Sequence, residues 1–133
     1  MFQLDLKSGK PFYIQIVNEY KSMLYRGYLN SGDSIPSVRK LALSLSVTPG
    51  TVAKAYQELE RQGIIETVRG KGTFISEFDK KGIVDEGELI RIKREISTQC
   101  LQLIFMGFKK KEYIQMMDQI YEDVVNKEEK KYD

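Results

Sequence analysis

The most constraining feature of this chain is the order of elements that residues 32–76 predict: two short helices joined by a tight turn, then a β-hairpin with a glycine-rich tip. Ser37 and Thr48 are predicted to cap the two helices, because a hydroxyl accepts from the free amides of a first turn. Pro49 suits a first helical position, and Gly63 suits the position after the last turn. This order is typical of a protein that places one helix in the major groove of DNA while a basic hairpin touches the backbone beside it.

The hairpin and the helix faces follow from residue patterns. Residues 64–68 and 73–76 are β-branched and alternating, and Arg69-Gly70-Lys71-Gly72 lies between them. Two glycines allow a tip with positive φ that approaches a phosphate closely. A helix is also predicted over 11–26, and residues 2–6 predict either a short strand or an ordered arm. Apolar residues three and four apart predict the buried faces: Ile14, Val17, Tyr20, Leu24; Val38, Leu41, Ala42, Leu45; Val52, Ala55, Tyr56, Leu59.

A helical tail is predicted over residues 85–127, after a linker at 77–84 and before a frayed terminus at 128–133. Its two amphipathic helices cover about 85–106 and 110–126, with Gly107 as the helix stop. Their apolar stripes are too wide to be buried against each other alone, so a second chain is expected to cover the remainder in a twofold-symmetric homodimer. The residues predicted at this interface are Leu89, Ile92, Ile96, Leu103, Tyr113, Met117, Ile120 and Val124.

Composition excludes several classes of function. The chain has no histidine, the commonest general base and metal ligand, and its carboxylates show no catalytic or metal-binding spacing. We therefore predict no enzyme activity, metal or cofactor. The absence of a run of about 18 apolar residues and of an apolar signal segment predicts a cytoplasmic protein without a membrane span. Cys100 lies among apolar residues, which favours an inert core thiol over a redox sensor.

Charge is unevenly spread along the chain. The net charge is only +2, but residues 1–78 hold ten of the 21 Lys and Arg and only seven of the 19 Asp and Glu. A modest positive surplus on one face can steer a protein toward DNA.

These residues resemble the DNA-binding domain of the GntR family of bacterial transcription regulators. The resemblance covers residues 11–76. It is carried by G-D-S-I-P-S-V-R-K-L-A from Gly32, V-T-P-G-T-V-x-K-A-Y-x-x-L-E-x-x-G-I-I from Val47 and R-G-K-G-T-F from Arg69, preceded by K-P-F-Y-I-Q-I. Order and spacing match across three elements, which is more specific than a lone helix-turn-helix pattern. The short tail is similar to that of the YtrA-like subfamily, which implies a dimerisation role and, in many members, control of a transporter operon.

The predicted fold is mainly α with a small β-hairpin: a winged helix-turn-helix over residues 1–76, followed by a two-helix antiparallel dimerisation tail. The resemblance implies that an arginine of the first motif reaches a base or phosphate and that the start of the next helix faces the groove. Gly50 departs from the family pattern and offers no side chain to a base. The predicted DNA-binding residues are Ser37, Arg39, Thr48, Gly50, Thr51, Lys54, Arg69, Gly70 and Lys71.

The predicted function is that of a sequence-specific transcription regulator, most simply a repressor, that binds a palindromic double-stranded operator as a homodimer. One winged helix reads only a few base pairs, so two copies are expected on half-sites about one helical turn apart. The family resemblance also implies a small-molecule effector that alters tail packing, although the sequence identifies none. The alternative is a winged-helix protein-interaction module that binds no DNA.

Overall fold

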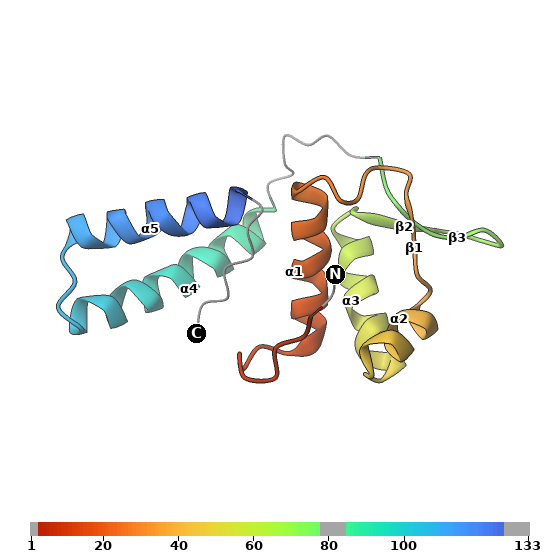
Figure 1. Ribbon diagram of the computed structural model, residues 1–133, viewed down its shortest axis with the longest axis horizontal. Helices are drawn as coiled ribbons and strands as arrows, with labels where there is room; N and C mark the ends of the chain where they lie inside the picture. The colour runs from red at the N-terminus through yellow and green to blue at the C-terminus, as the bar shows by residue number, and fades with distance from the viewer. Residues whose placement is uncertain (1–2, 78–84, 127–133) are drawn as a thin grey trace. The chain divides into compact units, whose positions relative to one another are not determined.

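The structure is a computed structural model that describes residues 3–77 and 85–126. The chain divides into two compact units, Met1–Phe78 and Asp79–Asp133, called here the headpiece and the tail. Most of the predicted linker lies outside the described residues, and so does all of the predicted frayed terminus. The headpiece contains α1 (Phe12–Tyr25), β1 (Ser34–Ile35), α2 (Val38–Leu45), α3 (Pro49–Arg61), β2 (Ile65–Val68) and β3 (Gly72–Ile75), and the tail contains α4 (Glu86–Phe105) and α5 (Lys110–Val125) (Figure 1).

The two helices of the predicted helix-turn-helix begin where their caps place them. The Ser37 hydroxyl accepts a hydrogen bond from the Lys40 amide at 3.2 Å, and Thr48 caps α3 in the same way, with Pro49 in its first turn. Ser46 ends α2 with a φ of 56°, a left-handed conformation that glycine usually supplies. The Val47 amide then bonds to the Ala42 carbonyl at 3.1 Å, which closes the turn between the helices.

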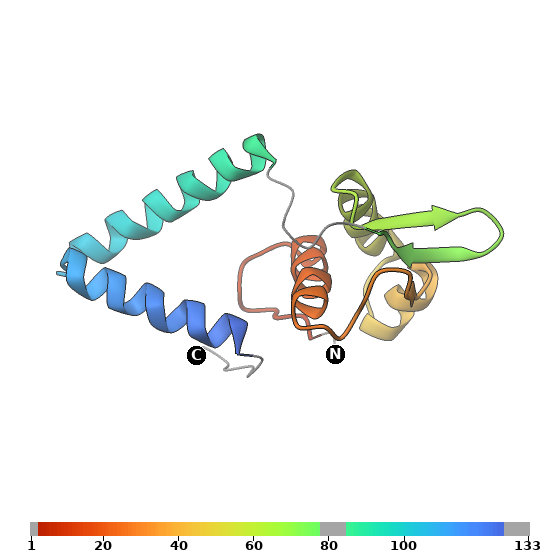
Figure 2. The same ribbon diagram turned by 90° about the horizontal axis from the view of Figure 1, so that it is seen from above.

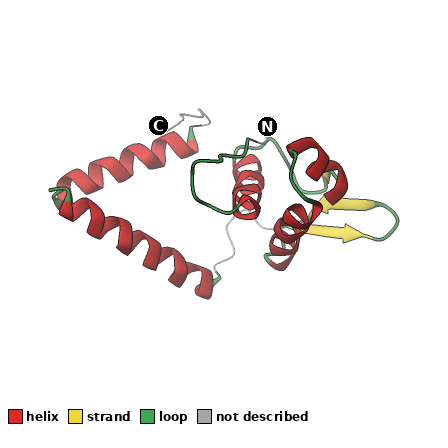
Figure 3. Ribbon diagram, turned by 90° about the horizontal axis from the view of Figure 1, so that it is seen from below, coloured by secondary structure: helices red, strands yellow, loops and turns green. Residues whose placement is uncertain are grey.

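The sheet has one strand more than the sequence patterns predicted. β2 and β3 form the expected antiparallel hairpin, with Val68 opposite Gly72 at its tip, and β1 pairs with the outer side of β3. β1 spans only two residues, too few for a periodic pattern, and its register places Ser34 opposite Phe74. It ties the segment before α2 to the base of the hairpin, so the wing and the helix-turn-helix share one framework (Figure 3).

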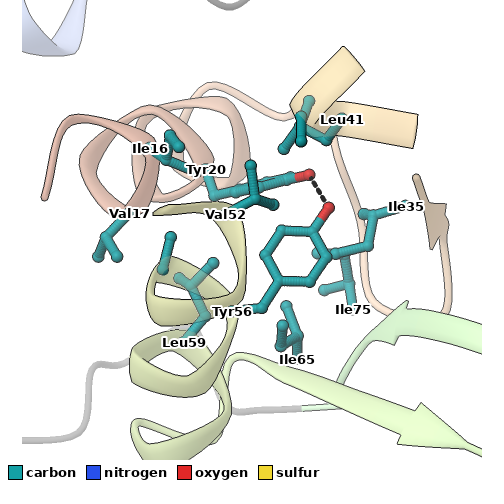
Figure 4. Packing of buried hydrophobic residues seen from close by; sticks show 12 residues of the cluster. Ile16, Val17, Tyr20, Ile35, Leu41, Val52, Tyr56, Leu59, Ile65 and Ile75 are labelled. Atoms are coloured by element: carbon teal, nitrogen blue, oxygen red, sulfur yellow. Dashed lines mark hydrogen bonds between the residues drawn. The ribbon is translucent and has the colours of Figure 1, made fainter. Parts of the chain in front are cut away.

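The headpiece core lies between α1, α3 and the sheet (Figure 4). All four residues of the stripe predicted on α3 are buried, whereas α1 buries Ile16 in place of Ile14. Each large apolar side chain removed from water contributes about 1.5–3 kcal/mol. The buried apolar residues are Ile16, Val17, Tyr20, Ile35, Leu41, Ala42, Val52, Ala55, Tyr56, Leu59, Ile65 and Ile75.

A chain of buried hydroxyls connects three elements of this core. The Tyr56 hydroxyl donates to the Pro36 carbonyl at 2.6 Å and lies 2.7 Å from the Tyr20 hydroxyl, which therefore donates to it (Figure 4). The rings of Tyr20 and Tyr56 also meet edge to face, with centroids 5.8 Å apart. This series of hydrogen bonds joins α1 and α3 to Pro36, the residue that precedes the cap of α2. Tyr56 is thus a core residue, as predicted, and is only 6% exposed.

The tail helices have the predicted limits, and within the described residues neither helix buries a single side chain. Asp85 caps α4 by accepting from the Glu88 amide, and the Phe108 amide closes its end on the Leu103 carbonyl at 3.0 Å. From this turn α4 and α5 diverge (Figure 2). Cys100, expected to be a core thiol, is half-buried on α4. No helix of the described chain is long and apolar enough to cross a membrane.

We expect Tyr56→Phe to lower the free energy of unfolding of the headpiece by about 1–3 kcal/mol. The change removes the donor to the buried Pro36 carbonyl and the hydroxyl that binds Tyr20, while the ring still fills its place. Urea unfolding of the full chain, monitored by circular dichroism, measures the loss. The control is Tyr25→Phe, because Tyr25 is an exposed tyrosine of α1. Equal stabilities of the two variants would contradict this role.

Candidate nucleic-acid interface

The start of α3 presents small polar side chains and an open backbone. Thr48 and Gly50 are exposed and Thr51 is half-buried. The Thr48 hydroxyl accepts from the Thr51 amide at 3.4 Å and lies 3.0 Å from the Thr51 hydroxyl, so capping engages both side-chain oxygens. Their methyl groups remain for apolar contact, the type of contact that a thymine methyl accepts in the major groove. A Cβ at Gly50 would meet only the Thr48 hydroxyl oxygen, at 4.0 Å.

Lys54, one turn further along α3, is held by a neighbour that sequence reasoning did not identify. Its ammonium lies 4.1 Å from the centre of the Tyr13 ring on α1, the geometry of a cation–π contact. Nothing in the local sequence shows this contact, because 41 positions separate the two residues and only the packing of α1 on α3 brings them together. This contact favours a position of the Lys54 ammonium beside the start of α1.

The far end of α3 carries a cation that is already neutralised. Arg61 binds the Glu58 carboxylate through two nitrogens, at 3.0 and 2.6 Å, and Gln62 adds a third hydrogen bond at 2.7 Å. The Arg61 guanidinium is the main reason that the pKa of Glu58 falls to about 2. Glu58 therefore stays ionised under ordinary conditions, and Arg61 belongs to this pair.

On α2 and on the wing, the predicted cations are exposed. Arg39 follows the Ser37 cap at the start of α2, and its side chain forms no ion pair or hydrogen bond within the described residues. At the wing tip, Arg69 and Lys71 are also exposed, and neither side chain forms an ion pair or hydrogen bond within the described residues. Gly70 has a φ of 79°, and the Lys71 amide bonds to the Val68 carbonyl at 2.9 Å, so the tip is a tight turn that requires glycine.

The structure brings the nine predicted residues onto three neighbouring elements of one unit. α2 packs against α3, and β2 follows directly from α3. The wing extends beyond the helices, with Arg69, Gly70 and Lys71 at its tip (Figure 2). This arrangement offers small polar groups from one helix, flanked by unpaired positive charges. Within the described residues no cluster of side chains could hold a metal ion.

This architecture defines the class of the protein as a winged helix-turn-helix. The family model described as "Bacterial regulatory proteins, gntR family" matches residues 12–75. The chain is also 41% identical over 124 residues to the HTH-type transcriptional repressor YtrA of Bacillus subtilis (strain 168), an alignment that covers 93% of this chain and 95% of the relative. The chain belongs to the GntR family and is YtrA-like. It is a transcription regulator and not an enzyme.

Solved structures agree with this assignment. A protein described as a transcriptional antiterminator from Listeria monocytogenes EGD-e superimposes with a TM-score of 0.84 at 35% identity, covering 99% of this chain and 98% of that one. YtrA from Sulfolobus acidocaldarius, described as a GntR-family transcription factor, has a TM-score of 0.57 at 30% identity, covering 71% and 96%. The predicted fold class, family and subfamily are therefore confirmed.

Gly50→Ala is expected to leave the fold intact and to change the free energy of unfolding by no more than about 1 kcal/mol, in the stabilising direction. Alanine favours a helix more than glycine does, and the new methyl group meets no atom closer than 4.0 Å. Thermal unfolding followed by circular dichroism tests this. The matched control is Gly70→Ala, which should destabilise the hairpin because of its positive φ. A large loss of stability for Gly50→Ala would show that a neighbour crowds the start of α3.

Proposed function

We propose that this regulator is a repressor that binds a palindromic operator as a homodimer, with the start of α3 in the major groove and the wing on the flanking backbone. The observation that carries the proposal is the distribution of charge on the headpiece. Lys54 and Arg61 are held by Tyr13 and Glu58, whereas Arg39 and the two wing-tip cations have no partner among the described residues. The wing-tip cations suit the phosphates that flank a groove, and the unpaired Arg39 is available to reach a base.

The residues divide by the contact that each suits. Arg39 carries a planar guanidinium that can bind the O6 and N7 atoms of a guanine together, so we assign base reading to it. Thr48 and Thr51 offer methyl groups to thymine. Arg69 and Lys71 are assigned to phosphates, because a backbone contact needs charge and reach without a fixed partner. Lys54 is also assigned to a phosphate, with its ammonium beside the Tyr13 ring of α1.

Arg39→Ala should cost about 1–3 kcal/mol of binding to a duplex selected from a random pool with the wild-type protein, and should change random-duplex binding much less. Lys71→Ala should weaken binding to both duplexes and make the salt dependence shallower by about one unit for each bound headpiece. Fluorescence anisotropy at several salt concentrations measures both effects. Lys93→Ala, an exposed lysine of α4, is the control for lost charge.

Two outcomes would overturn the assignment. If Arg39→Ala matched the wild type on the selected duplex, α2 would not take part in base reading. If the wild-type protein failed to bind any duplex at low salt, the headpiece would be a protein-interaction module instead, because every DNA-binding winged helix has some non-specific affinity.

The tail supports the homodimer. Its apolar side chains are exposed in the single chain, including Leu101 at 55%, Ile104 at 59% and Phe105 at 85%. A soluble monomer rarely presents so many neighbouring apolar groups, and surfaces of this kind are usually covered by a partner. An identical chain provides the matching surface through a twofold axis, which also sets the spacing between two recognition helices. We place the eight predicted interface residues of α4 and α5 at this contact.

Sedimentation equilibrium of the full chain at micromolar concentration should give about twice the chain mass of 15.4 kDa. Ile96→Glu should shift the mass toward one chain, because an unpaired carboxylate would have to be buried at the contact. Thr98→Glu adds the same charge to an exposed position of α4 and serves as the matched control. A wild-type protein that remained a monomer would exclude the dimer.

The proposal has three further parts. The protein represses transcription, its target is a transporter operon, and an effector acts on the packing of the tail. They are supported by the resemblance to the YtrA-like subfamily, and repression also by the description of the Bacillus subtilis relative as a repressor. Genome-wide footprinting in cells with and without the protein would locate the sites and show whether transcription of the neighbouring genes rises when the protein is absent.

A further inference from the structure

The described part of the segment before α1, residues 3–11, forms no strand and is held in place by hydrogen bonds. A single side chain, that of Gln15 on α1, organises it. The Gln15 side-chain oxygen accepts from the Asp5 amide at 2.7 Å, and its nitrogen lies 2.9 Å from the Asp5 carbonyl, 3.0 Å from the Ser8 hydroxyl and 3.0 Å from the Lys10 carbonyl. The loop of residues 5–10, called here the arm, is thereby closed onto the first turn of α1.

The arm also has hydrogen bonds of its own. The Asp5 carboxylate accepts from the Lys7 amide at 2.8 Å, and the Ser8 hydroxyl accepts from the Lys10 amide at 3.2 Å. Gly9 adopts a φ of 73°, which lets the chain turn back toward the helix. These bonds use the acidic and hydroxyl groups of the arm internally. The side chains of Lys7 and Lys10 remain exposed and unpaired within the described part of the chain.

The arm lies at the end of the headpiece that holds the start of α3. It leads into the first turn of α1, where Tyr13 contacts Lys54 of α3. In Figure 1 the arm and the turn between α2 and α3 are both at the lower end of the headpiece. The wing is attached to the opposite side of α3, through the sheet. Two lysines on a folded loop thus lie on the side of α3 away from the wing.

We infer that the arm is a second backbone clamp for DNA, in which Lys7 and Lys10 bind phosphates on the side of α3 away from the wing, and that Gln15 is the residue that positions them. The inference rests on the proposed DNA-binding function. The partner is the duplex itself, whose repeating phosphates suit two point charges on a short rigid loop. Because the loop is already folded by Gln15, little ordering entropy is lost on binding.

Lys7→Ala/Lys10→Ala tests the clamp. It should weaken binding to selected and random duplexes alike. It should also make the slope of log affinity against log salt shallower by about two units for each bound headpiece, one for each lost contact. Lys93→Ala/Lys111→Ala removes the same two charges from the tail and should keep the wild-type slope. All four lysines are exposed, so neither double variant should alter thermal unfolding. A wild-type slope for Lys7→Ala/Lys10→Ala would overturn the inference.

Gln15→Leu tests the positioning role separately. It should reduce affinity toward that of the double-lysine variant, and the triple variant should bind no more weakly than the double, because both changes disable one clamp. Additive losses would show that Gln15 does not act through the arm and would overturn its role. The wild-type titration separates the two levels of the proposal: if wild type binds no duplex, the proposed function fails, whereas wild-type binding with an unchanged slope in the lysine variant overturns the clamp alone.

Discussion

The geometry of the headpiece depends on two buried tyrosine hydroxyls. Tyr20 and Tyr56 come from α1 and α3, and the chain that they form ends on the carbonyl of Pro36, next to the cap of α2. Burial raises the pKa of both hydroxyls above the ordinary tyrosine value, so both keep their protons and remain donors. Apolar packing alone would tolerate small rotations of one helix against another. A directional series of hydrogen bonds through three groups does not tolerate such rotations.

The same framework explains how charge is distributed on the headpiece. The packing of α1 on α3 that brings the tyrosines together also places Tyr13 beneath Lys54. Pairing of β1 with β3 ties the residues before α2 to the base of the hairpin. Cations without partners among the described residues lie on the outer parts of this framework: at the start of α2, at the tip of the wing and on the arm.

Local signals in the sequence were sufficient to predict most of the fold. Thr48-Pro49, Ser37 and Gly63 define helix ends through bonds to their own neighbours, and the stripe on α3 was predicted in full because spacing alone determines it. What could not be predicted depends on residues distant in sequence. β1 exists only because β3 pairs with it, and Lys54 meets Tyr13 only through tertiary packing.

For the candidate site, sequence reasoning located the nine residues on the expected elements, but it did not predict which of their side chains already have partners. It also left open whether the segment before α1 is a strand or an arm, because the residue that decides the question, Gln15, lies on the following helix. Ser46 was missed as a left-handed residue for a different reason: glycine is the usual signal there, and serine gives none.

Within the described residues, α4 and α5 of the tail bury no side chain, and this affects how the protein behaves in a cell. If two tails pair as proposed, the free energy that holds α4 and α5 in place comes from association, so it grows with the number of copies present. Scarce chains would then carry an ordered headpiece on an unsupported tail, open to proteases. Abundant chains would protect one another. The amount of active regulator would therefore rise more steeply than the rate of its synthesis.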